Sequence, residues 1–242
     1  MTPRTEVLVA HQPAYLPWPG FFARLLDVDR LLLLDGVQYT QGGWQNRNFV
    51  AGPHGVRVRM TVPVCRGFGQ PISHVRIAEE PWRARHWRTL THTYRRAPYW
   101  DQWEERLRTV YARPWTHLAA VNEELIRLLL EALGLPVTLL RSTQLAPAGA
   151  KTRMLIDLCQ RTGTRVLRVG TGATTYLDVG LLAREGIAVE VATWTSPPRV
   201  SWPGGPLSVL DLVLRHGPAA REILAEGAQV APWRGGARAV SA

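Results

Sequence analysis

The sequence predicts an α/β protein whose mixed, mainly parallel sheet is flanked by helices, with a β-hairpin insertion and a helical segment in the middle. Three observations support this fold class. Apolar runs typical of buried parallel strands occur at residues 6–11 and 30–35, with room for a helix between them. Strand-like and helix-like segments alternate from 136 to 193. The 242 residues are 46% hydrophobic, which is enough to bury both faces of such a sheet.

The N-terminal part is expected to form a β-α-β unit followed by the hairpin. The connecting helix lies within residues 18–29 and starts after a Pro-Gly pair. Its buried side chains would be Phe21, Phe22, Leu25 and Leu26. The hairpin arms are 46–51 and 56–64, joined by the four-residue loop 52–55. A short edge strand is expected at 72–77.

Residues 81–133 have a helical pattern that is broken at Pro98 and Pro114. The clearest helix, 115–133, carries an apolar stripe of Leu118, Val121, Leu125, Leu128 and Leu129. The later strands are expected at 136–141, 165–169 and 187–193, and the later helices at 152–161, 177–185 and 208–214. We expect one α/β domain over residues 1–232, with the helical subregion at 81–133, and a disordered tail over 233–242.

The chain is strongly basic, with a net charge of +10 and a pI near 10.7. Almost all of its basic residues are arginine, and Lys151 is the one lysine. A GC-rich genome would explain this composition. Contact with an anion would explain it too, whether nucleic acid, a phosphorylated metabolite or an acidic carrier protein. Nucleic acid is disfavoured, because no known binding signature occurs and the arginine- and aromatic-rich segment 82–113 better fits an amphipathic helix.

No apolar run reaches the roughly 18 residues that a membrane span needs, and the first apolar run is too short for a signal peptide. We therefore expect a cytoplasmic protein that does not bind a membrane. The two cysteines, Cys65 and Cys159, fit a reducing compartment. They lack metal-type spacing, and His86 and His92 are six residues apart, so no metal site is expected.

Polar side chains follow the apolar strands and mark the best candidate site. The first strand ends at His11-Gln12, and the second ends at Asp35, with Gln38 shortly after it. Since parallel strands place their carboxyl ends at one edge of a sheet, we expect these side chains to share that edge. Cys65 follows the second hairpin arm. If that strand end converges on the same edge, it completes a Cys-His-Asp arrangement suited to acyl transfer through a thioester.

The residue pattern leaves other roles open for these three side chains. His11 could act alone as a general base or as a group that orients the substrate. Asp35 could orient His11 or hold a substrate amine. Cys65 could be a small apolar filler, as free cysteines often are.

A second group of candidates lies in the segment 44–48, Trp-Gln-Asn-Arg-Asn. Amides and arginine together suit the recognition of carboxylate, phosphate or amide groups. Alternatively, Asn46 and Asn48 satisfy the backbone of a loop. Lys151 could bind an anion or cover a helix surface. Residues 170–172, Gly-Thr-Gly, lack a full phosphate-loop fingerprint, so we interpret them as a backbone turn that could face a ligand.

Three N-terminal blocks, HQPAYLPWPGFF, LDGVQYTQGGWQNRN and TVPV, resemble the WbqC-like protein family. The segments HWRTLTHTYRRAPYW, KTRMLIDLC and LSVLDLVLRHG also fit, so the resemblance covers nearly the whole chain. The family's signature positions match His11, Gln12, Tyr15, Asp35, Gln38, Trp44, Asn46, Arg47 and Asn48. Two departures are Cys65, where a basic residue is more common, and GTGATTY at 170–176, which differs from the usual serine-glycine loop.

The resemblance implies a bacterial protein of surface-polysaccharide or natural-product biosynthesis that attaches acyl or aminoacyl groups to amines. We therefore expect an acyl- or aminoacyl-transferase that forms an amide from a carrier-bound thioester and a small-molecule amine. His11 would deprotonate the amine or activate Cys65, and Gln12, Gln38 and Asn46 would hold the carbonyl.

The basic surface would then meet an acidic acyl or peptidyl carrier protein. The protein would need no cofactor of its own, although its donor could be linked to phosphopantetheine. One alternative is a nucleotide- or sugar-nucleotide-binding protein without transferase chemistry of its own. A nucleic-acid-binding protein is a further alternative that rests on charge alone.

Overall fold

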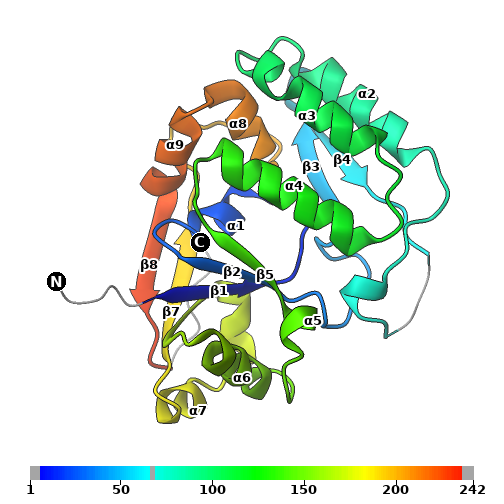
Figure 1. Cartoon of the computed structure of the whole chain (residues 1–242). Coiled ribbons are helices and arrows are strands. Elements are labelled where there is room, and N and C mark those ends of the chain that lie inside the picture. The colour runs from blue at the N-terminus through cyan, green and yellow to red at the C-terminus, as the bar shows by residue number, and fades with distance from the viewer. Residues whose placement is uncertain (1–5, 66–68, 236–242) are drawn as a thin grey trace.

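The computed structural model describes residues 6–65 and 69–235. Within these residues, six strands form one sheet in the order β5-β2-β1-β6-β7-β8, and β3 and β4 form a separate hairpin (Figure 1). The strands span Val7–His11 (β1), Arg30–Leu33 (β2), Arg47–Ala51 (β3), Arg57–Thr61 (β4), Thr138–Arg141 (β5), Val166–Gly170 (β6), Ala188–Trp194 (β7) and Ala228–Pro232 (β8). Neighbouring strands of the main sheet are parallel, except for the β7–β8 pair. The predicted mixed, mainly parallel sheet is confirmed.

The order in which the chain adds strands to this sheet defines a topological switch point. From β1 the chain moves outward to β2 and then to β5, after which it returns to the other side of β1 and adds β6, β7 and β8. The direction of winding therefore reverses between β1 and β6. In open α/β sheets, ligands bind in the crevice that this reversal leaves at the carboxyl ends of the strands.

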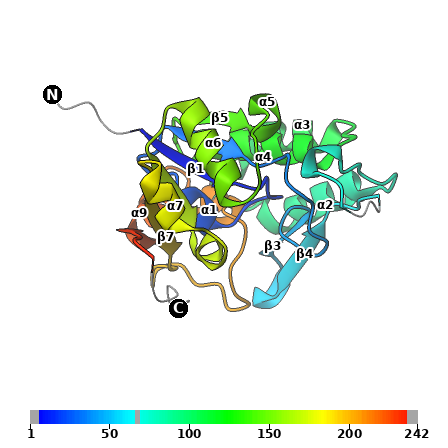
Figure 2. The ribbon, with the colours of Figure 1, turned by 90° about the horizontal axis from the view of Figure 1, so that it is seen from below.

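Helices cover both faces of the main sheet (Figures 1 and 2). They span Pro19–Ala23 (α1), Trp82–Tyr94 (α2), Trp100–Ala112 (α3), Leu118–Ala132 (α4), Ser142–Leu145 (α5), Thr152–Thr162 (α6), Val179–Arg184 (α7), Leu210–His216 (α8) and Ala219–Gly227 (α9). Alternate residues of a strand point to opposite faces. Leu8 and Leu32 accordingly pack on one face with Leu155 of α6 and Leu182 of α7. Val9, Leu31 and Leu33 point to the other face and pack with α1, α4 and α8.

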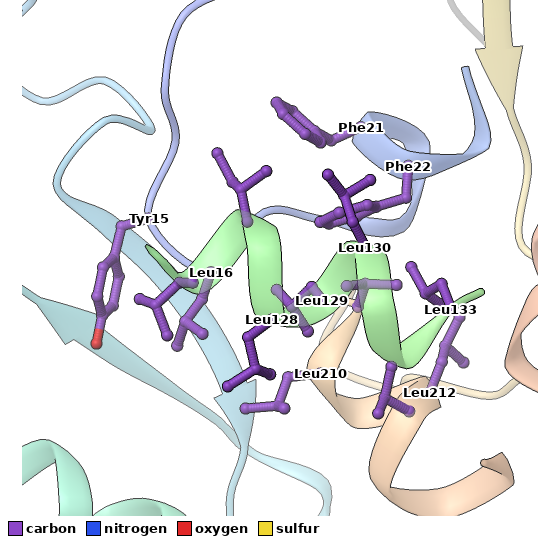
Figure 3. Packing of buried hydrophobic residues seen from close by; sticks show 14 of the residues in the cluster. Tyr15, Leu16, Phe21, Phe22, Leu128, Leu129, Leu130, Leu133, Leu210 and Leu212 are labelled. Carbon is purple, nitrogen blue, oxygen red and sulfur yellow. The ribbon is translucent and has the colours of Figure 1, made fainter. Parts of the chain in front are cut away.

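Helix α4 is the centre of the larger core. Its predicted leucine stripe is buried, and Leu129 has no exposed surface. Figure 3 shows Leu130 close to the phenylalanines of α1 and Leu128 beside Leu210 of α8. The helix ends at Ala132, and the αL conformation of Gly134 (φ 61°) turns the chain toward β5. One helix thus joins α1, on the main sheet, to α8.

The hairpin packs against α2, away from the main sheet (Figure 1): the Ala51 N–H donates to the Tyr94 hydroxyl, and Thr93 Oγ1 donates to the Ala51 carbonyl oxygen. Its strands are antiparallel, with Val50 opposite Val58, as the alternating pattern predicts. Helix α2 is amphipathic, with Trp82, His86, Leu90 and Tyr94 buried at intervals of four residues. The predicted helical subregion is therefore present, and its arginines lie mostly on the outer face.

Some elements differ from the sequence prediction. Helix α1 is shorter than expected, although Phe21, Phe22 and Leu25 are buried as predicted. The predicted edge strand at 72–77 is wrong for its first half, because Ile72–His74 is a 3₁₀ turn (η2), in which His74 N–H donates to Pro71 O. Its last two residues, Arg76 and Ile77, form isolated β-bridges with His117 and Val64. Helix α9 and strand β8 were not predicted. Strand β8 is largely exposed and lacks the apolar run by which a strand is predicted. Of the predicted tail, residues 236–242 lie outside the described part of the chain.

Tyr15, a predicted binding residue, belongs to the core. Its side chain is fully buried, and its hydroxyl lies 2.8 Å from His86 Nδ1 and 2.6 Å from the Tyr111 hydroxyl. Burial, together with the charge of Arg85, lowers the pKa of His86 to about 4, and a hydrogen bond to the backbone of Thr61 opposes this shift. His86 is therefore neutral at pH 7, and its Nδ1 accepts a hydrogen bond from the Tyr15 hydroxyl. The three side chains tie the loop after β1 to α2 and α3.

The low pKa of His86 predicts acid-sensitive folding. The unfolded chain takes up this proton near the ordinary pKa of 6.5, while the folded chain does so only near 4, so stability is lost as the pH falls through this window. We expect a loss of up to about 1.4 kcal/mol per pH unit from this residue. Urea unfolding at several pH values between 7 and 4.5 measures it. In His86→Gln the free energy of unfolding should fall less steeply with decreasing pH, by this amount. Parallel plots of this free energy against pH for the two proteins would contradict the low pKa of His86.

Candidate functional site

The candidate site lies at the carboxyl ends of β1 and β6, where the winding of the sheet reverses. β1 ends at His11, and β6 ends at Gly170. The two strands are paired in parallel, with Val9 opposite Arg168, so their ends meet at one edge. The chain leaves β1 through the loop 12–18, while β6 continues into the 3₁₀ turn Thr171–Thr175 (η3). The Gly-Thr-Gly segment predicted to be a backbone turn lies at the start of η3.

His11 is a neutral imidazole with one nitrogen fixed. Its Nδ1 lies 2.7 Å from the Gln12 carbonyl oxygen, which can only accept, so Nδ1 carries the proton and Nε2 is left as a base. The ring packs edge-on against Phe21 and Trp18, at centroid distances of 4.9 and 5.6 Å. Burial and the nearby charge of Arg24 lower the pKa of His11 to about 3, despite the bond to Gln12. His11 is therefore uncharged at neutral pH.

Arg24 lies beside His11 and is a site residue that the sequence prediction missed. It follows α1 directly and is only 8% exposed, with Nε donating to Gly20 O at 3.0 Å. A Cβ atom at Gly170 would lie 2.9 Å from both terminal nitrogens of Arg24. No acidic side chain in residues 6–65 or 69–235 pairs with this guanidinium, and burial alone lowers its pKa to about 10. Its position between buried phenylalanines and leucines was the available signal.

Trp18 and two glutamines connect the loop before β3 to this edge. The Trp18 ring lies 5.8 Å from Arg24 Cζ and 6.3 Å from the ring of Trp44, which is 50% exposed. Gln45 Nε2 donates to Gln12 Oε1 at 2.8 Å. The predicted residues that the structure brings together are thus His11, Gln12 and Trp44. Gln45 completes this arrangement, because its buried side chain holds Gln12.

Asp35 does not orient His11. Its Oδ1 accepts from Ser142 Oγ and from the Thr143 N–H, both at 2.9 Å, and its Oδ2 accepts from Thr143 Oγ1 at 2.6 Å. The physical reason is that β2 pairs with β5 as well as with β1, placing Leu33 opposite Arg141. The carboxylate two residues beyond Leu33 therefore meets the first residues of α5. Asp35 joins β2 to α5, and both of its oxygens accept hydrogen bonds from residues of α5.

Cys65 does not join His11 either. The hairpin forms its own sheet, so the end of β4 is not an end of the main sheet. Cys65 is exposed, and its N–H donates to Arg76 O at 2.9 Å. The structure therefore does not assemble the predicted Cys-His-Asp arrangement. Cys159, by contrast, lies on the buried face of α6 as an apolar core residue.

The polar residues of the segment 44–48 mainly support the backbone. Asn46 Nδ2 donates to Val62 O at 2.9 Å, and Asn48 Nδ2 donates to Leu16 O at 2.6 Å. Arg47 donates to Gly42 O and closes the loop before β3. Leu16 has a left-handed backbone conformation (φ 42°), which is strained for a leucine and requires support. These contacts favour the structural interpretation of Asn46 and Asn48.

Gln38 and Lys151 lie outside the cluster around His11. Gln38 is exposed, and its backbone forms an isolated bridge with Pro71. Lys151 is exposed and precedes α6 with a positive φ of 50°. Among the described residues, no group of three His, Cys, Asp or Glu side chains is placed to hold a metal. In the same part of the chain, no helix has both the length and the apolar character that crossing a membrane requires.

These features define a doubly wound α/β protein with a neutral histidine and a buried arginine at its switch point. The chain belongs to the WbqC-like protein family, whose model matches residues 12–223. It is 29% identical over 222 residues to the uncharacterized protein Rv1507c of Mycobacterium tuberculosis, a match that covers 88% of this chain and 95% of that protein. No solved structure is significantly similar to this chain. The family predicted from the sequence is confirmed.

The structural role of Asn48 predicts the effect of removing it. Asn48→Ala leaves the carbonyl of strained Leu16 without its buried partner, so we expect a loss of about 1–3 kcal/mol in the free energy of unfolding. Chemical denaturation measures this value. Gln38→Ala is the matched control, since an exposed side chain should change stability by less than about 0.5 kcal/mol. A fully stable Asn48→Ala protein that has lost ligand binding would instead assign Asn48 to the site.

Proposed function

We propose that this protein is an acyl- or aminoacyl-transferase that forms an amide from a carrier-bound thioester and an amine, in natural-product or surface-polysaccharide biosynthesis. The observation that supports this most directly is the state of His11. It is neutral, its Nδ1 proton is directed to the Gln12 carbonyl oxygen, and its Nε2 is left as an acceptor at the switch point. A positioned neutral imidazole is the usual general base for such a transfer.

In the proposed reaction the acyl group moves directly from thioester to amine. His11 Nε2 takes a proton from the amine as its nitrogen attacks the thioester carbonyl. The new C–N bond forms, the C–S bond breaks, and the departing thiolate takes up the proton. Gln12 accepts from Gln45 through Oε1, so its own Nε2 donor is available for the developing oxyanion. This route needs no acyl-enzyme and no cofactor of the protein's own.

The basic surface supports an acidic carrier protein as the partner that delivers the acyl group. Helix α2 and the turn that follows it present exposed cationic side chains, among them Arg88, Arg95 and Arg96, while the buried face of α2 packs on the core. Positive surfaces of this kind accelerate association with acidic proteins, and the effect weakens with salt. The transfer would take place in the cytoplasm, where loaded carrier proteins occur.

The test compares two variants in a reconstituted transfer reaction. Acetyl- and aminoacyl-carrier thioesters are incubated with a panel of primary amines, and amide products are quantified by mass spectrometry. We expect His11→Ala to lose about 10²-fold or more in rate, because it removes the base. Cys65→Ser should keep the wild-type rate.

Intact-protein mass spectrometry of the same samples provides the control. A covalent acyl adduct on Cys65, or an equal loss of rate in both variants, would contradict direct transfer. If neither transfer nor an acyl-enzyme forms with any donor, the proposed function itself is wrong.

A second candidate function is the binding of a nucleotide or sugar nucleotide without transfer chemistry. The specific observation in its favour is the strand order, β5-β2-β1-β6-β7-β8, which matches the order of dinucleotide-binding sheets and has the same switch point. Saturable thermal stabilisation by a sugar nucleotide such as UDP-glucose, without amide formation in the transfer reaction, would favour this function.

A further inference from the structure

Two arginines of this fold are equally buried but very differently partnered. Arg24 and Arg168 are each 8% exposed. Arg168 Nε pairs with Glu190 Oε2 at 2.8 Å, and its Nη1 donates to the carbonyl oxygens of Arg24 and Leu26 at 3.2 and 2.9 Å. Among the described residues, Arg24 makes one hydrogen bond, from Nε, and has no acidic partner. Its two terminal nitrogens make no hydrogen bond to a described residue, and neither is among the fully buried polar atoms that lack a partner, so both remain accessible to a ligand.

A buried guanidinium without an anion is costly to the fold. Removing the charge from water carries a penalty that only a counter-charge or several hydrogen bonds offset. Arg168 has both kinds of compensation, whereas Arg24 has one carbonyl and a cation–π contact with the Trp18 ring, 5.8 Å from its centroid. The compensation missing from Arg24 matches what an anionic ligand supplies.

Gly170 allows the Arg24 guanidinium to lie at the β1–β6 edge. Gly170 adopts φ −90° and ψ 170°, which any residue tolerates, so its backbone does not require glycine. What requires it is Arg24: a Cβ at residue 170 would lie 2.9 Å from both Nη1 and Nη2, closer than side chains pack. The absence of a side chain at Gly170 therefore leaves room for the two terminal nitrogens beside the end of β6.

We propose that Arg24 is an anion-binding residue, which holds a carboxylate or phosphate oxyanion of the substrate at the β1–β6 edge, beside His11. Two parallel hydrogen bonds from Nη1 and Nη2 give arginine its preference for such groups. The proposal rests on the proposed function for the identification of this ligand as a substrate. The anion site itself requires only Arg24, Gly170 and the switch point.

Binding of an anion here also acts on His11. The charge of Arg24 is one of the causes that hold the pKa of His11 near 3. An oxyanion on Arg24 offsets that charge, so the pKa of His11 rises toward its ordinary value and Nε2 becomes a stronger base when the substrate is bound. The substrate would thereby switch on the base that acts on it. NMR titration of His11, with and without the anion, reports this rise.

The binding test uses inorganic phosphate and acetate at pH 7, with the ionic strength held constant by sodium chloride. We expect at least one of the two anions to raise the melting temperature of the wild-type protein in a saturable manner. Arg24→Met should bind about tenfold more weakly or worse. Gly170→Ala should do the same while retaining the guanidinium. Arg88→Met removes an exposed charge on α2 and should bind as the wild type does.

Stability without added anion provides a second, independent measurement. Arg24→Met should melt at or above the wild-type temperature, because it removes an uncompensated buried charge. Arg168→Met should melt lower, because it leaves Glu190 unpaired. If Arg24→Met does not fold, the result contradicts this expectation, and Gly170→Ala still tests the anion site.

Saturation by phosphate alone identifies a phosphate-bearing substrate, and saturation by acetate alone identifies a carboxylate. Absence of saturable binding by both anions, or equal binding in wild type, Arg24→Met and Gly170→Ala, would overturn the proposal. These outcomes are separate from the transfer reaction. Amide formation without anion binding would leave the proposed function standing, and anion binding without amide formation would leave the site standing.

Discussion

The loop between β1 and α1, residues 12–18, is the element on which the rest of the structure depends. It is held by four hydrogen bonds from three separate parts of the chain. Asn48 Nδ2 donates to Leu16 O, Asn122 Nδ2 to Pro13 O and Val209 N–H to Pro17 O, while Trp44 O accepts from the Tyr15 N–H. Each such bond is worth about 1 kcal/mol net, but leaving a buried carbonyl unpaired costs more. The loop thus joins the hairpin, α4 and α8 to the main sheet.

The same loop builds the site, because both of its ends lie there. His11 precedes the loop and Trp18 ends it, and the centroids of their two rings lie 5.6 Å apart. Since α1 is only five residues long, the chain returns quickly, and Arg24 comes back to the edge at Gly170. Arg24 lies one turn after Gly20, and its Nε donates to the Gly20 carbonyl oxygen. This short return places a base and a cation side by side.

Most of the main sheet and its helices could be predicted from the sequence, since hydrophobic periodicity and turn residues act over short distances. The chemistry of the strand ends was harder to predict. Asp35 follows a strand as His11 does, yet the pairing of β2 with β5 turns it toward Ser142. Cys65 follows a strand that belongs to another sheet.

Arg24 shows a different limit of sequence reasoning. An arginine at the end of a short helix is normally expected at the surface. The apolar residues around Arg24 in the sequence point to its burial, but its contact with Gly170 is visible only in the structure. The contacts of Asn46 and Asn48 could likewise not be predicted from the sequence, because each carbonyl they bind lies at least 16 residues away in the chain. Long-range partners of this kind leave no local pattern.

The four anchors of the loop use none of the side chains that we assign to the reaction. Asn48 and Asn122 hold backbone carbonyl oxygens, so His11 and Arg24 can change without disturbing them. Descendants of one ancestral chain can therefore keep the shape of this loop while exchanging the groups at its ends. A block of amides and prolines that two relatives share then shows that they inherited the same loop conformation. Under the proposed function, a difference in substrate between two relatives would arise at positions 11, 24 and 170.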